Sequence, residues 1–431
     1  MEHPRVIIVM TTPYSRNNSS RSLDAYFHFW EHDRVRQIFS RNWKPQKGHC
    51  GELFQITDAE LLKCRLHRLK DPGTVYKRED LEDSGHNETL EEGSVASKSY
   101  SIGRKHSPSV ELLRGMLWNK KYWCSEKLIK WLDDYRPELI FYNFTNNLFL
   151  QKIVLFLAER YRIPVVSAIG DDYYFSDRKS ISPAYNLFRR KFKASVRKVF
   201  EQKGSAVYVC DGIRDRYNAE FGLDGETVYF CSSVERRPFR PINDENPVIS
   251  YFGNIRIGRY KSILKIADSL LAINSDYRIN VYSNEQDEEY TSALKDHPGV
   301  VFHGEIPYDE VQLRIKESDI YVVTEDFDKS SVDLTKYSVS TKVADGLMCG
   351  TAVLAFGPEE CGAIKYLKET GGAAVCSDDS QLKDIISKLI ADEVFQREIY
   401  DSSAVAAGKN HSVNGSCAAF ENVVRKALAK N

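Results

Sequence analysis

The sequence predicts an α/β protein with two lobes, each built on a doubly wound parallel sheet. The chain has 431 residues, well above the roughly 150 residues of an average domain. Short β-branched segments alternate with amphipathic segments of helical length, which is typical of parallel sheets with crossover helices. A polar segment at 236–247 contains three prolines and suits a linker. We therefore expect lobes at 1–242 and 243–431, with the boundary near Asn243.

The second half of the chain is the more regular. Its predicted strands are 248–252, 278–282, 300–303, 319–324, 351–355 and 373–376. Its predicted helices have apolar residues at three- and four-residue spacing and cover 261–273, 288–295, 309–317, 341–348 and 360–368. A final helix is expected because Cys417, Phe420, Val424 and Leu428 fall on one helical face.

The first half repeats the α/β pattern less regularly. Its predicted strands are 6–10, 139–142, 165–168, 206–209 and 227–230. A polar stretch at about 70–107 is rich in glycine and glutamate and lacks periodicity, so we expect a mobile flap there.

Charge and composition exclude several classes of protein. Sixty Lys and Arg residues against 61 Asp and Glu residues give a net charge of -1, which removes the general attraction to nucleic acid. No apolar run approaches the roughly 20 residues of a spanning helix. The 9 cysteines are scattered without a Cys-x-x-Cys pair, so we expect reduced thiols and a cytoplasmic protein.

The loop after the strand at 248–252 has the composition of a phosphate site. It contains Gly253, Asn254 and Gly258, followed by Arg259 and Lys261 at the start of a helix. Glycines let a ligand approach the backbone, and a helix amino terminus with cations favours an anion. The alternative, a tight turn with solvated cations, is equally compatible with this loop alone.

A second candidate site lies at the start of the helix at 341–348. Ser340 and Thr341 place hydroxyl groups there, and Lys342 puts a cation in the first helical turn. A cation is disfavoured at that position unless an anion lies nearby, which a diphosphate would supply. Asp345, three residues later, could accept hydrogen bonds from sugar or ribose hydroxyls. The alternative is a surface pair of Lys342 with Asp345.

In the first half, Asp171 and Asp172 follow a buried strand, where a loop would direct carboxylates into a cleft. One of them could contact the reacting group, and the equally weighted alternative is an aspartate that caps the next helix. The polar loop at 11–21 follows the first strand and could face the same cleft. Neither the Asp326-Phe327-Asp328 triplet nor the pair His28 and His32 predicts a metal site.

The helical pattern around residues 185–199 carries many cations. An apolar stripe is flanked by Arg189, Arg190, Lys191, Lys193, Arg197 and Lys198. Such a face can rest on anionic lipid, although a solvated outer face over an ordinary core stripe is the more frequent outcome.

These features together resemble the GT-B glycosyltransferases, specifically retaining, family-4-like enzymes of bacterial capsule and lipopolysaccharide assembly. The resemblance spans nearly the whole chain. Its clearest parts are 251–254, 304–307, 340–342 and 345–353, and the segments 17–21 and 54–58 look like those of enzymes acting on surface glycans.

The resemblance implies roles for individual residues. The donor diphosphate would be bound by Arg259, Lys261, Lys342, Gly253, Asn254, Ser340 and Thr341. The donor sugar or ribose would contact Asp345 and Tyr337, the nucleobase Glu305 and Ile306, and the acceptor Asn18, Ser19, Ser20 and Arg21, with Asp171 and Asp172 as catalytic candidates. The family pattern of two glutamates with seven residues between them falls on Tyr337 and Asp345, so the first carboxylate is missing; Glu325 and Asp333 are reserve candidates.

The implied activity is transfer of a hexosyl group from a nucleotide sugar to a glycan acceptor, expected to be lipid-linked. The resemblance implies retention of anomeric configuration and no cofactor or metal. It also implies bacterial surface polysaccharide synthesis, with peripheral contact to the inner face of an anionic membrane. Two alternatives stay open: a nucleotide-sugar epimerase of similar fold, and a catalytically silent relative that binds glycans or acts as a scaffold.

Overall fold

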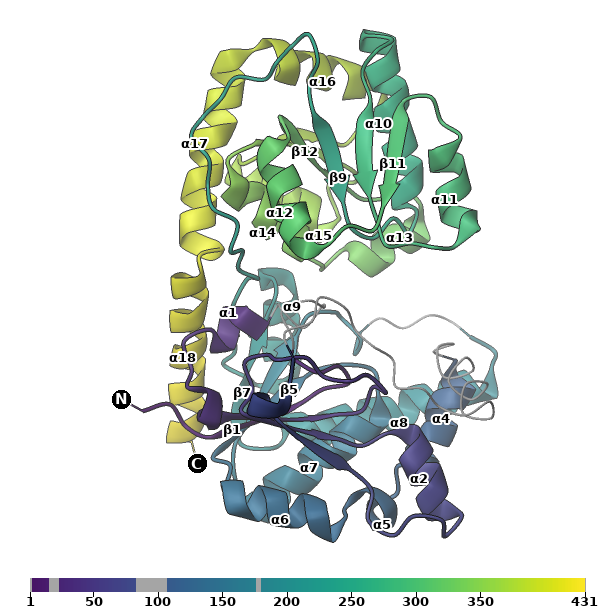
Figure 1. Cartoon of the computed structure of the whole chain (residues 1–431), viewed down its shortest axis with the longest axis vertical. Helices are drawn as coiled ribbons and strands as arrows, with labels where there is room; N and C mark the ends of the chain where they lie inside the picture. Colours follow the sequence, from purple (N-terminus) through teal and green to yellow (C-terminus); the bar gives the residue numbers. More distant parts are fainter. Residues whose placement is uncertain (1, 15–22, 83–106, 176–179, 431) are drawn as a thin grey trace. The chain divides into compact units, whose positions relative to one another are not determined.

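The computed structural model describes residues 2–14, 23–82, 107–175 and 180–430, and the chain forms two units (Figure 1). The first unit comprises Met1–Thr227 together with Cys417–Asn431, and the second comprises Val228–Ser416. Each unit is an α/β domain with its own sheet, as the sequence predicts.

The sheet of the first unit has the strand order β4-β3-β2-β1-β5-β6-β7-β8. All neighbours pair in parallel except β3 and β4, which are antiparallel. The strands are β1 (Val6–Val9), β2 (Val35–Phe39), β3 (Glu52–Gln55), β4 (Thr74–Lys77), β5 (Leu139–Asn143), β6 (Val165–Ile169), β7 (Gly204–Tyr208) and β8 (Glu226–Thr227).

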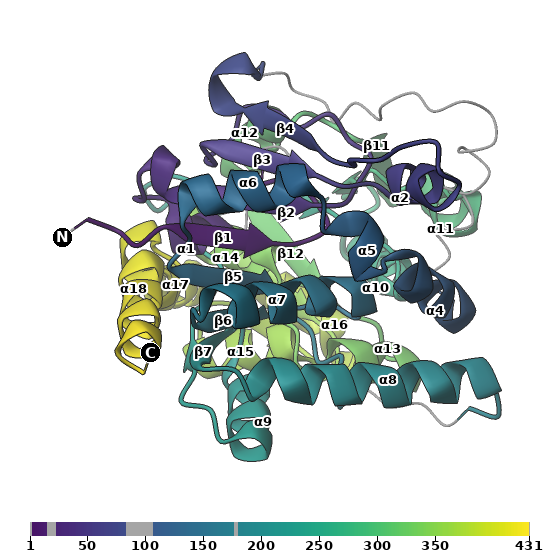
Figure 2. The same ribbon diagram turned by 90° about the horizontal axis from the view of Figure 1, so that it is seen from below.

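The helices of the first unit cover this sheet, and Figures 1 and 2 show α6 and α7 along one of its faces. Their starts follow ordinary capping chemistry: Thr57 and Glu60 form a capping box on α2, and Ser182 caps α8 with a proline in its first turn. The helices are α1 (Asp24–Phe27), α2 (Asp58–Arg65), α4 (Pro108–Leu117), α5 (Lys120–Trp123), α6 (Glu126–Tyr135), α7 (Leu148–Tyr161), α8 (Pro183–Phe200) and α9 (Asp211–Phe221).

The last helix, α18 (Val413–Ala429), confirms the predicted closing helix and belongs largely to the first unit. Its Phe420 is fully buried, with ring centroids 5.1 Å from Phe27, 5.7 Å from Phe141 and 5.0 Å from Tyr26. Phe420 meets Phe27 and Phe141 edge to face, an arrangement that aromatic pairs favour.

The sheet of the second unit is parallel throughout, with the order β11-β10-β9-β12-β13-β14. The order reverses direction at β9 and β12, which makes this the switch point of a doubly wound sheet. The strands are β9 (Ile249–Phe252), β10 (Ile279–Tyr282), β11 (Val300–Gly304), β12 (Ile320–Thr324), β13 (Ala352–Phe356) and β14 (Ala374–Cys376).

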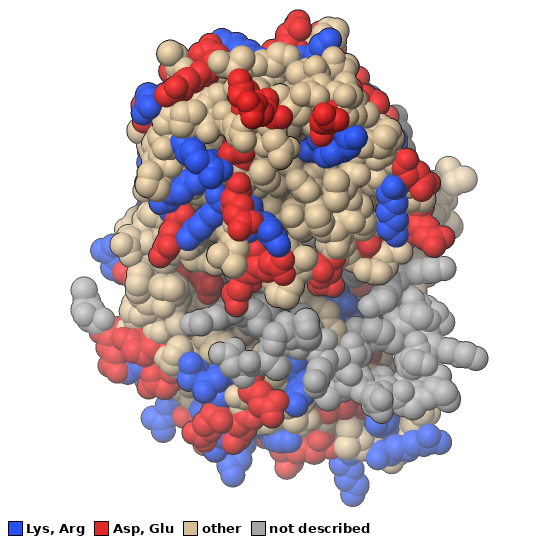
Figure 3. All heavy atoms as spheres, turned by 45° about the horizontal axis from the view of Figure 1, so that its top comes forward, with Lys and Arg blue, Asp and Glu red and all other residues tan. Residues whose placement is uncertain are grey.

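The core of the second unit lies between this sheet and its helices. Ile249, Ile263, Ile266, Val322 and Leu389 are among its fully or almost fully buried residues. The helices are α10 (Arg259–Ile273), α11 (Glu288–Lys295), α12 (Tyr308–Glu317), α13 (Lys329–Thr335), α14 (Thr341–Cys349), α15 (Gly362–Thr370), α16 (Leu382–Ala391) and α17 (Glu393–Asn410). Figure 3 shows basic and acidic side chains interspersed over the displayed surface, in keeping with the net charge of -1.

The division between the units differs from the expected boundary near Asn243. Residues 228–242 belong to the second unit because their side chains are bound there. Arg236 donates to the carbonyl of Leu347 (2.8 Å), and Arg237 donates to that of Lys316 (2.9 Å). Ile242 is part of the second core, so the segment expected as a linker is anchored to the second unit at Arg236, Arg237 and Ile242, while residues 243–246 are exposed.

The two described ends of the expected flap at 70–107 have regular structure. Residues 74–77 form β4, which pairs with β3 through partners such as Gln55 and Thr74. At the other end, Ser107 accepts a hydrogen bond from the amide of Val110 and starts α4. The intervening residues 83–106 lie outside the described part of the chain. None of the helices in the described residues has the length and apolar composition that crossing a bilayer requires.

Candidate functional site

The carboxyl ends of β9 to β14 share one edge of the second sheet, here called the carboxyl edge, and most of the predicted donor-site residues follow these strands. In open α/β sheets this edge, at the switch point, is where ligands bind. The loop from β9 to α10 contains Gly253 at φ +113° and Gly258 at φ +70°. A Cβ at Gly253 would lie 2.8 Å from Cε of Lys342, and one at Gly258 only 2.0 Å from Oδ2 of Asp326. The absence of a Cβ at Gly253 and Gly258 therefore leaves space for the side chains of Lys342 and Asp326.

The three cations of this loop are bound to carboxylates. Arg256 forms an ion pair with Glu285, and Lys261 reaches Asp328 at 2.5 Å. Lys261 and Asp328 are both exposed, so their pair is of the kind that contributes little to stability, whereas the Glu285 side chain is only 9% exposed. The cations of the loop are therefore paired with carboxylates of the protein, whichever of the two alternatives, bound phosphate or solvated cations, holds for the loop.

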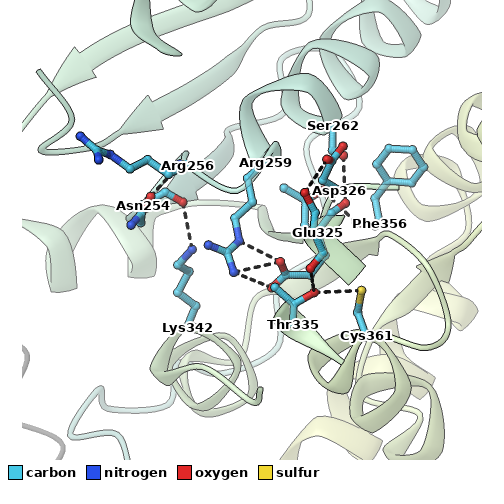
Figure 4. Close-up of polar contacts among 12 residues, drawn as sticks. Asn254, Arg256, Arg259, Ser262, Glu325, Asp326, Thr335, Lys342, Phe356 and Cys361 are labelled. Atoms are coloured by element: carbon cyan, nitrogen blue, oxygen red, sulfur yellow. Dashed lines mark hydrogen bonds and ion pairs between the residues drawn. The ribbon is translucent and has the colours of Figure 1, made fainter. Parts of the chain in front are cut away.

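Arg259 differs from the other two cations because its ion pair is buried (Figure 4). Nε donates to Oε2 of Glu325 at 2.9 Å and Nη2 donates to Oε1 at 3.0 Å, a bidentate pair. Side-chain exposure is 11% for Arg259 and 5% for Glu325. Nη1 of Arg259 has no hydrogen-bond partner among the described residues. It is the guanidinium nitrogen left for a ligand.

Glu325 is held rigidly at the end of β12. Its amide donates to the carbonyl of Phe356 at 3.0 Å, and its own carbonyl accepts from the hydroxyl of Ser262 at 2.9 Å. Behind it, Ser331 donates to Asp326 at 2.8 Å. The reserve candidate Glu325 thus lies in the site as the partner of Arg259, whereas the other reserve candidate, Asp333, is an exposed residue of α13.

Lys342 lies in the first turn of α14, as predicted, and has no carboxylate partner among the described residues. Its Nζ donates to the hydroxyl of Tyr251 at 2.8 Å and lies 3.5 Å from the carbonyl oxygen of Asn254 (Figure 4). Burial, followed by the charge of Arg259, lowers the pKa of Lys342 to about 7, while Glu325 opposes the shift. The site therefore holds an amine that, among the described residues, has no carboxylate counter-ion.

The amino terminus of α14 adds to this positive environment. Ser340 is its N-cap residue but its side chain accepts no capping hydrogen bond, and Thr341 begins the helix. The N-cap of α10, Gly258, likewise supplies no side-chain cap. Unfilled amide donors at helix starts favour an anion, as does the helix dipole.

Asp345 and Tyr337 lie on or near α14, and among the described residues neither forms a hydrogen bond or ion pair with Lys342. Asp345 is buried in α14, where Oδ1 accepts a hydrogen bond from Ser232 at 2.7 Å. Since Lys342 has no ion pair, the surface pair of Lys342 with Asp345 does not form. Tyr337 precedes α14, and its ring lies 5.6 Å from Nζ of Lys336. The sugar or ribose role of both residues stays a prediction.

Glu305 and Ile306 follow β11 at the same carboxyl edge, with Glu305 exposed and Ile306 half-buried. A row of rings that the sequence reasoning missed runs towards them across four strands. The centroid distances are 4.4 Å from His303 to Tyr282, 4.8 Å from Tyr282 to Phe252 and 5.8 Å from Phe252 to Tyr321. An aromatic residue or histidine at or near the end of β9, β10 and β11 was the available signal, whereas Tyr321 lies near the start of β12 and offered none.

In the first unit, Asp171 and Asp172 have different surroundings although they are neighbours. Asp172 forms an ion pair with Arg216, and its Oδ1 accepts from the amide of Phe175 at 3.2 Å, as a capping aspartate would. Asp171 is exposed and accepts a hydrogen bond from the hydroxyl of Tyr173 at 3.0 Å. Asp171 is therefore the one of the two carboxylates that has no cationic partner among the described residues.

The acceptor candidates Asn18, Ser19, Ser20 and Arg21 lie outside the described residues. The described residues contain no group of three or more His, Cys, Asp or Glu side chains that could hold a metal ion.

No protein-family model and no curated protein sequence matches the chain. Solved structures do resemble it over nearly its full length. HepE of Anabaena, solved with UDP and glucose, has a TM-score of 0.61 at 12% identity, covering 98% of this chain and 100% of that one. A glycosyltransferase from Rickettsia africae has a TM-score of 0.53 at 10% identity, covering 99% and 100%.

TarM of S. aureus has a TM-score of 0.51 at 10% identity over 68% of this chain and 57% of that one. At such identities the likeness concerns the fold alone. The chain has the GT-B fold of these glycosyltransferases, with two Rossmann-like α/β domains.

Proposed function

We propose that the protein is a glycosyltransferase that binds the diphosphate of a nucleotide sugar at the carboxyl edge of its second unit. The observation that carries this proposal is the amine of Lys342, which lies at the start of α14 and has no carboxylate partner in the part of the chain that the structure describes. A lysine beside a guanidinium and a helix amino terminus is electrostatically unfavourable until an anion arrives. A diphosphate supplies that anion.

In this proposal, three groups of the site contact the leaving diphosphate. Lys342 and the first amides of α14 would bind phosphate oxygens, and Nη1 of Arg259 would donate one further hydrogen bond. Glu325 holds Arg259 in place through the other two positions of the guanidinium. These groups stabilise the charge that develops on the diphosphate as the bond from the anomeric carbon to oxygen breaks.

In the proposed reaction the diphosphate leaves with the bonding electrons, and an acceptor hydroxyl oxygen forms the new bond to the anomeric carbon. The acceptor oxygen attacks from the same face that the departing phosphate leaves, and that phosphate takes the hydroxyl proton. The anomeric configuration is therefore retained, and neither a protein nucleophile nor a metal is part of the scheme. Asp171 would accept a hydrogen bond from a sugar hydroxyl. Asp345 and Tyr337 would bind donor hydroxyls, and Glu305 and Ile306 would contact the base.

Known relatives by fold support the class of substrate. HepE was solved with UDP-glucose, and TarM was solved with UDP, α-GlcNAc-glycerol and fondaparinux. We extend this to a hexosyl donor and a lipid-linked glycan acceptor of bacterial surface polysaccharide synthesis. The sequence segments 17–21 and 54–58 support the acceptor class through their resemblance to enzymes of that type.

The first experiment is a titration of the purified chain with UDP, GDP, CMP and dTDP, with and without EDTA, monitored by thermal shift and calorimetry. One nucleoside diphosphate is expected to bind and to raise the melting temperature with or without EDTA. Lys342→Met should weaken that binding by about tenfold or more, since it removes a charge-assisted contact. Lys383→Met, an exposed lysine of α16, is the matched control.

Turnover distinguishes the candidate functions. The sugar conjugate of the nucleotide that binds should be hydrolysed slowly and transferred to a glycan acceptor, with the product keeping the donor's anomeric configuration. Nucleotide binding without any turnover would instead support the silent, glycan-binding alternative. Equal affinity of wild type and Lys342→Met would remove the proposed donor site.

A further inference from the structure

A serine of the second unit binds the carboxylate of Asp345. Oγ of Ser232 donates to Oδ1 of Asp345 at 2.7 Å, and both residues are 5% exposed. The same Oγ accepts a hydrogen bond from the amide of Val234 at 3.2 Å. Hydrogen bonds to a charged acceptor are stronger than those between neutral groups. Ser232 therefore fixes one oxygen of this buried carboxylate.

Ser232 is itself held by a residue that is distant in sequence. Its amide donates to the carbonyl of His411, the residue that follows α17, at 3.1 Å. The His411 ring is 1% exposed; Nδ1 donates to the carbonyl of Phe230 at 2.7 Å, and Nε2 accepts from the hydroxyl of Tyr366 at 3.0 Å. Burial lowers the pKa of His411, in keeping with a neutral ring that makes both bonds. The backbone that carries the Ser232 hydroxyl is therefore anchored to the end of α17.

Lys342 and Asp345 are three residues apart on α14, a spacing at which side chains of opposite charge attract each other. Here Nζ of Lys342 donates to the hydroxyl of Tyr251, and Asp345 accepts from Ser232 instead. Helical side chains lean towards the amino terminus, which directs Asp345 towards the turn that carries Lys342. The flexible four-carbon stem of a lysine allows its amine to reach a neighbour on the same face. The side chain that binds Asp345 in place of Lys342 is Ser232.

Titratable groups from several elements face these two side chains. They are Arg259 of α10, Glu325 after β12 and Tyr251 of β9 around Lys342, and His411 after α17 and Cys349 of α14 around Asp345. Glu325 makes two hydrogen bonds to Arg259 and so compensates that guanidinium. Asp345 is the only carboxylate of α14. A pair with Asp345 would therefore give Lys342 a counter-ion within its own helix.

We propose that Ser232 is a positioning residue of the donor site: its hydroxyl holds the carboxylate of Asp345 away from the amine of Lys342 and so keeps that amine open to an anion. Without the hydroxyl, Asp345 pairs with Lys342, and this pair competes with the diphosphate for the ammonium group. Only the identity of the anion rests on the proposed function. Because the Ser232 backbone is bonded to His411, the end of α17 is linked to the charge of the donor site.

The first test measures the reactivity of Lys342 in the absence of any nucleotide. The full chain is labelled briefly with acetic anhydride between about pH 6 and about pH 10, and mass spectrometry quantifies acetylation at Lys342. In wild type the labelling rate should follow an amine whose pKa is about 7. In Ser232→Ala the midpoint should rise by about one pH unit or more, because an adjacent carboxylate favours the protonated amine.

The second test measures the affinity for UDP by calorimetry over the same pH range. Ser232→Ala should bind UDP about fivefold or more weakly near neutral pH, because the pair with Asp345 and the bound diphosphate exclude each other. Its affinity should also fall less steeply above about pH 7.5 than that of wild type, since the paired amine keeps its proton. A role of Ser232 in stability alone would change neither this slope nor the labelling midpoint.

Ser233 provides the matched control because it is the neighbouring serine, is exposed and accepts a hydrogen bond from Gln312 at 3.3 Å. Ser233→Ala and Ser232→Thr, which keeps the hydroxyl, should behave as wild type in both tests. If Ser232→Ala does not fold, Ser232→Cys keeps the volume but donates weakly, and its labelling midpoint should still rise. In an Asp345→Asn background, adding Ser232→Ala should leave the labelling midpoint in place and change the affinity for UDP by less than about twofold, since an amide cannot form the ion pair.

Equal labelling midpoints in wild type and Ser232→Ala would overturn the proposal. The same loss of UDP affinity in the Asp345→Asn background as in wild type would also overturn it, because Asp345 would then have no part in the effect. If UDP binds to neither wild type nor any variant, the proposed function fails for this nucleotide, whereas the labelling midpoints still decide the role of Ser232.

Discussion

At the scale of single residues, Lys342 is unusual because three of its surroundings disfavour its charge. It is partly removed from water, it lies beside Arg259, and it occupies the first turn of a helix. Its two oxygen neighbours, from Tyr251 and Asn254, are neutral. Near neutral pH the amine of Lys342 is therefore only partly protonated in the free protein. An anion that binds beside it would stabilise the protonated form.

We predict that diphosphate binding takes up a proton at Lys342. In the free protein the pKa of this amine is about 7, far below that of an ordinary lysine. Above about pH 7.5, where a terminal phosphate is fully ionised, affinity should fall up to about tenfold per pH unit, since the amine must be protonated first. Calorimetry in buffers of different ionisation enthalpy measures the uptake, and Lys342→Met should remove the pH dependence. A slope shared by wild type and this variant would contradict the prediction.

The same pKa sets the sign of a stability effect without ligand. Because the folded pKa is lowered, the unfolded chain binds more protons between about pH 7 and pH 10. The contribution of Lys342 to folding free energy thus becomes more favourable as pH rises through that window, while diphosphate binding weakens.

Glu325 gives a second prediction. Glu325→Gln leaves the buried guanidinium of Arg259 without its counter-charge, which should lower the free energy of unfolding by about 3 kcal/mol in urea denaturation. A diphosphate should then restore more stability to the variant than it adds to wild type, because the ligand replaces the missing charge. Asp328→Asn, in the exposed pair with Lys261, should cost less than about 1 kcal/mol. Equal costs for both variants would contradict a special role for the buried pair.

At the scale of elements, the loop after β6 separates the two aspartates that the sequence could not rank. Asp172→Asn should lower stability by about 1–3 kcal/mol, since Arg216 loses its partner, while transfer activity persists. Asp171→Asn should leave stability unchanged and abolish transfer with nucleotide binding intact. Urea denaturation and transfer assays on both variants decide this, and the reverse pattern would assign catalysis to Asp172.

The strands show how far the sequence could be interpreted. Those of the second unit were predicted closely because burial on both faces makes them continuous apolar runs, as in β12 and β13. β2 and β3 were missed because Arg36, Gln37 and Glu52 interrupt the pattern. Arg36 pairs with Glu52 across the strands, and fully buried Gln37 binds the amide of Tyr14 and the carbonyl of Thr12. Tertiary partners satisfy these polar residues, and no local signal reveals them.

The site was predictable to a similar extent. The loop after β9 and the start of α14 were identified from glycines, hydroxyls and cations, and the structure brings Gly253, Asn254 and Lys342 together. The pairing of Arg259 with Glu325, which is 66 residues away, depends on the adjacency of β9 and β12. Spacing along the chain contains no information about that contact.

At the scale of the whole molecule, α18 is the element that completes the first unit. Phe420→Ala should lower the unfolding free energy of that unit by about 3–5 kcal/mol, because it empties a site among Phe27, Phe141 and Tyr26. Denaturation followed by circular dichroism measures the loss. Val405→Ala, at an exposed position of α17, is the control and should change stability by less than about 0.5 kcal/mol. A small effect at Phe420 would mean that the helix is not part of the first core.

The chain passes between the units twice, once after Thr227 and again after Ser416. A single recombination event in the gene therefore cannot exchange the first unit for that of another enzyme, since its last helix is encoded at the far end. A chimaera made by one junction near residue 228 would pair a foreign sheet with the native α18. An altered first unit must then arise either by substitution within it or by an exchange with two junctions that carries the helix along.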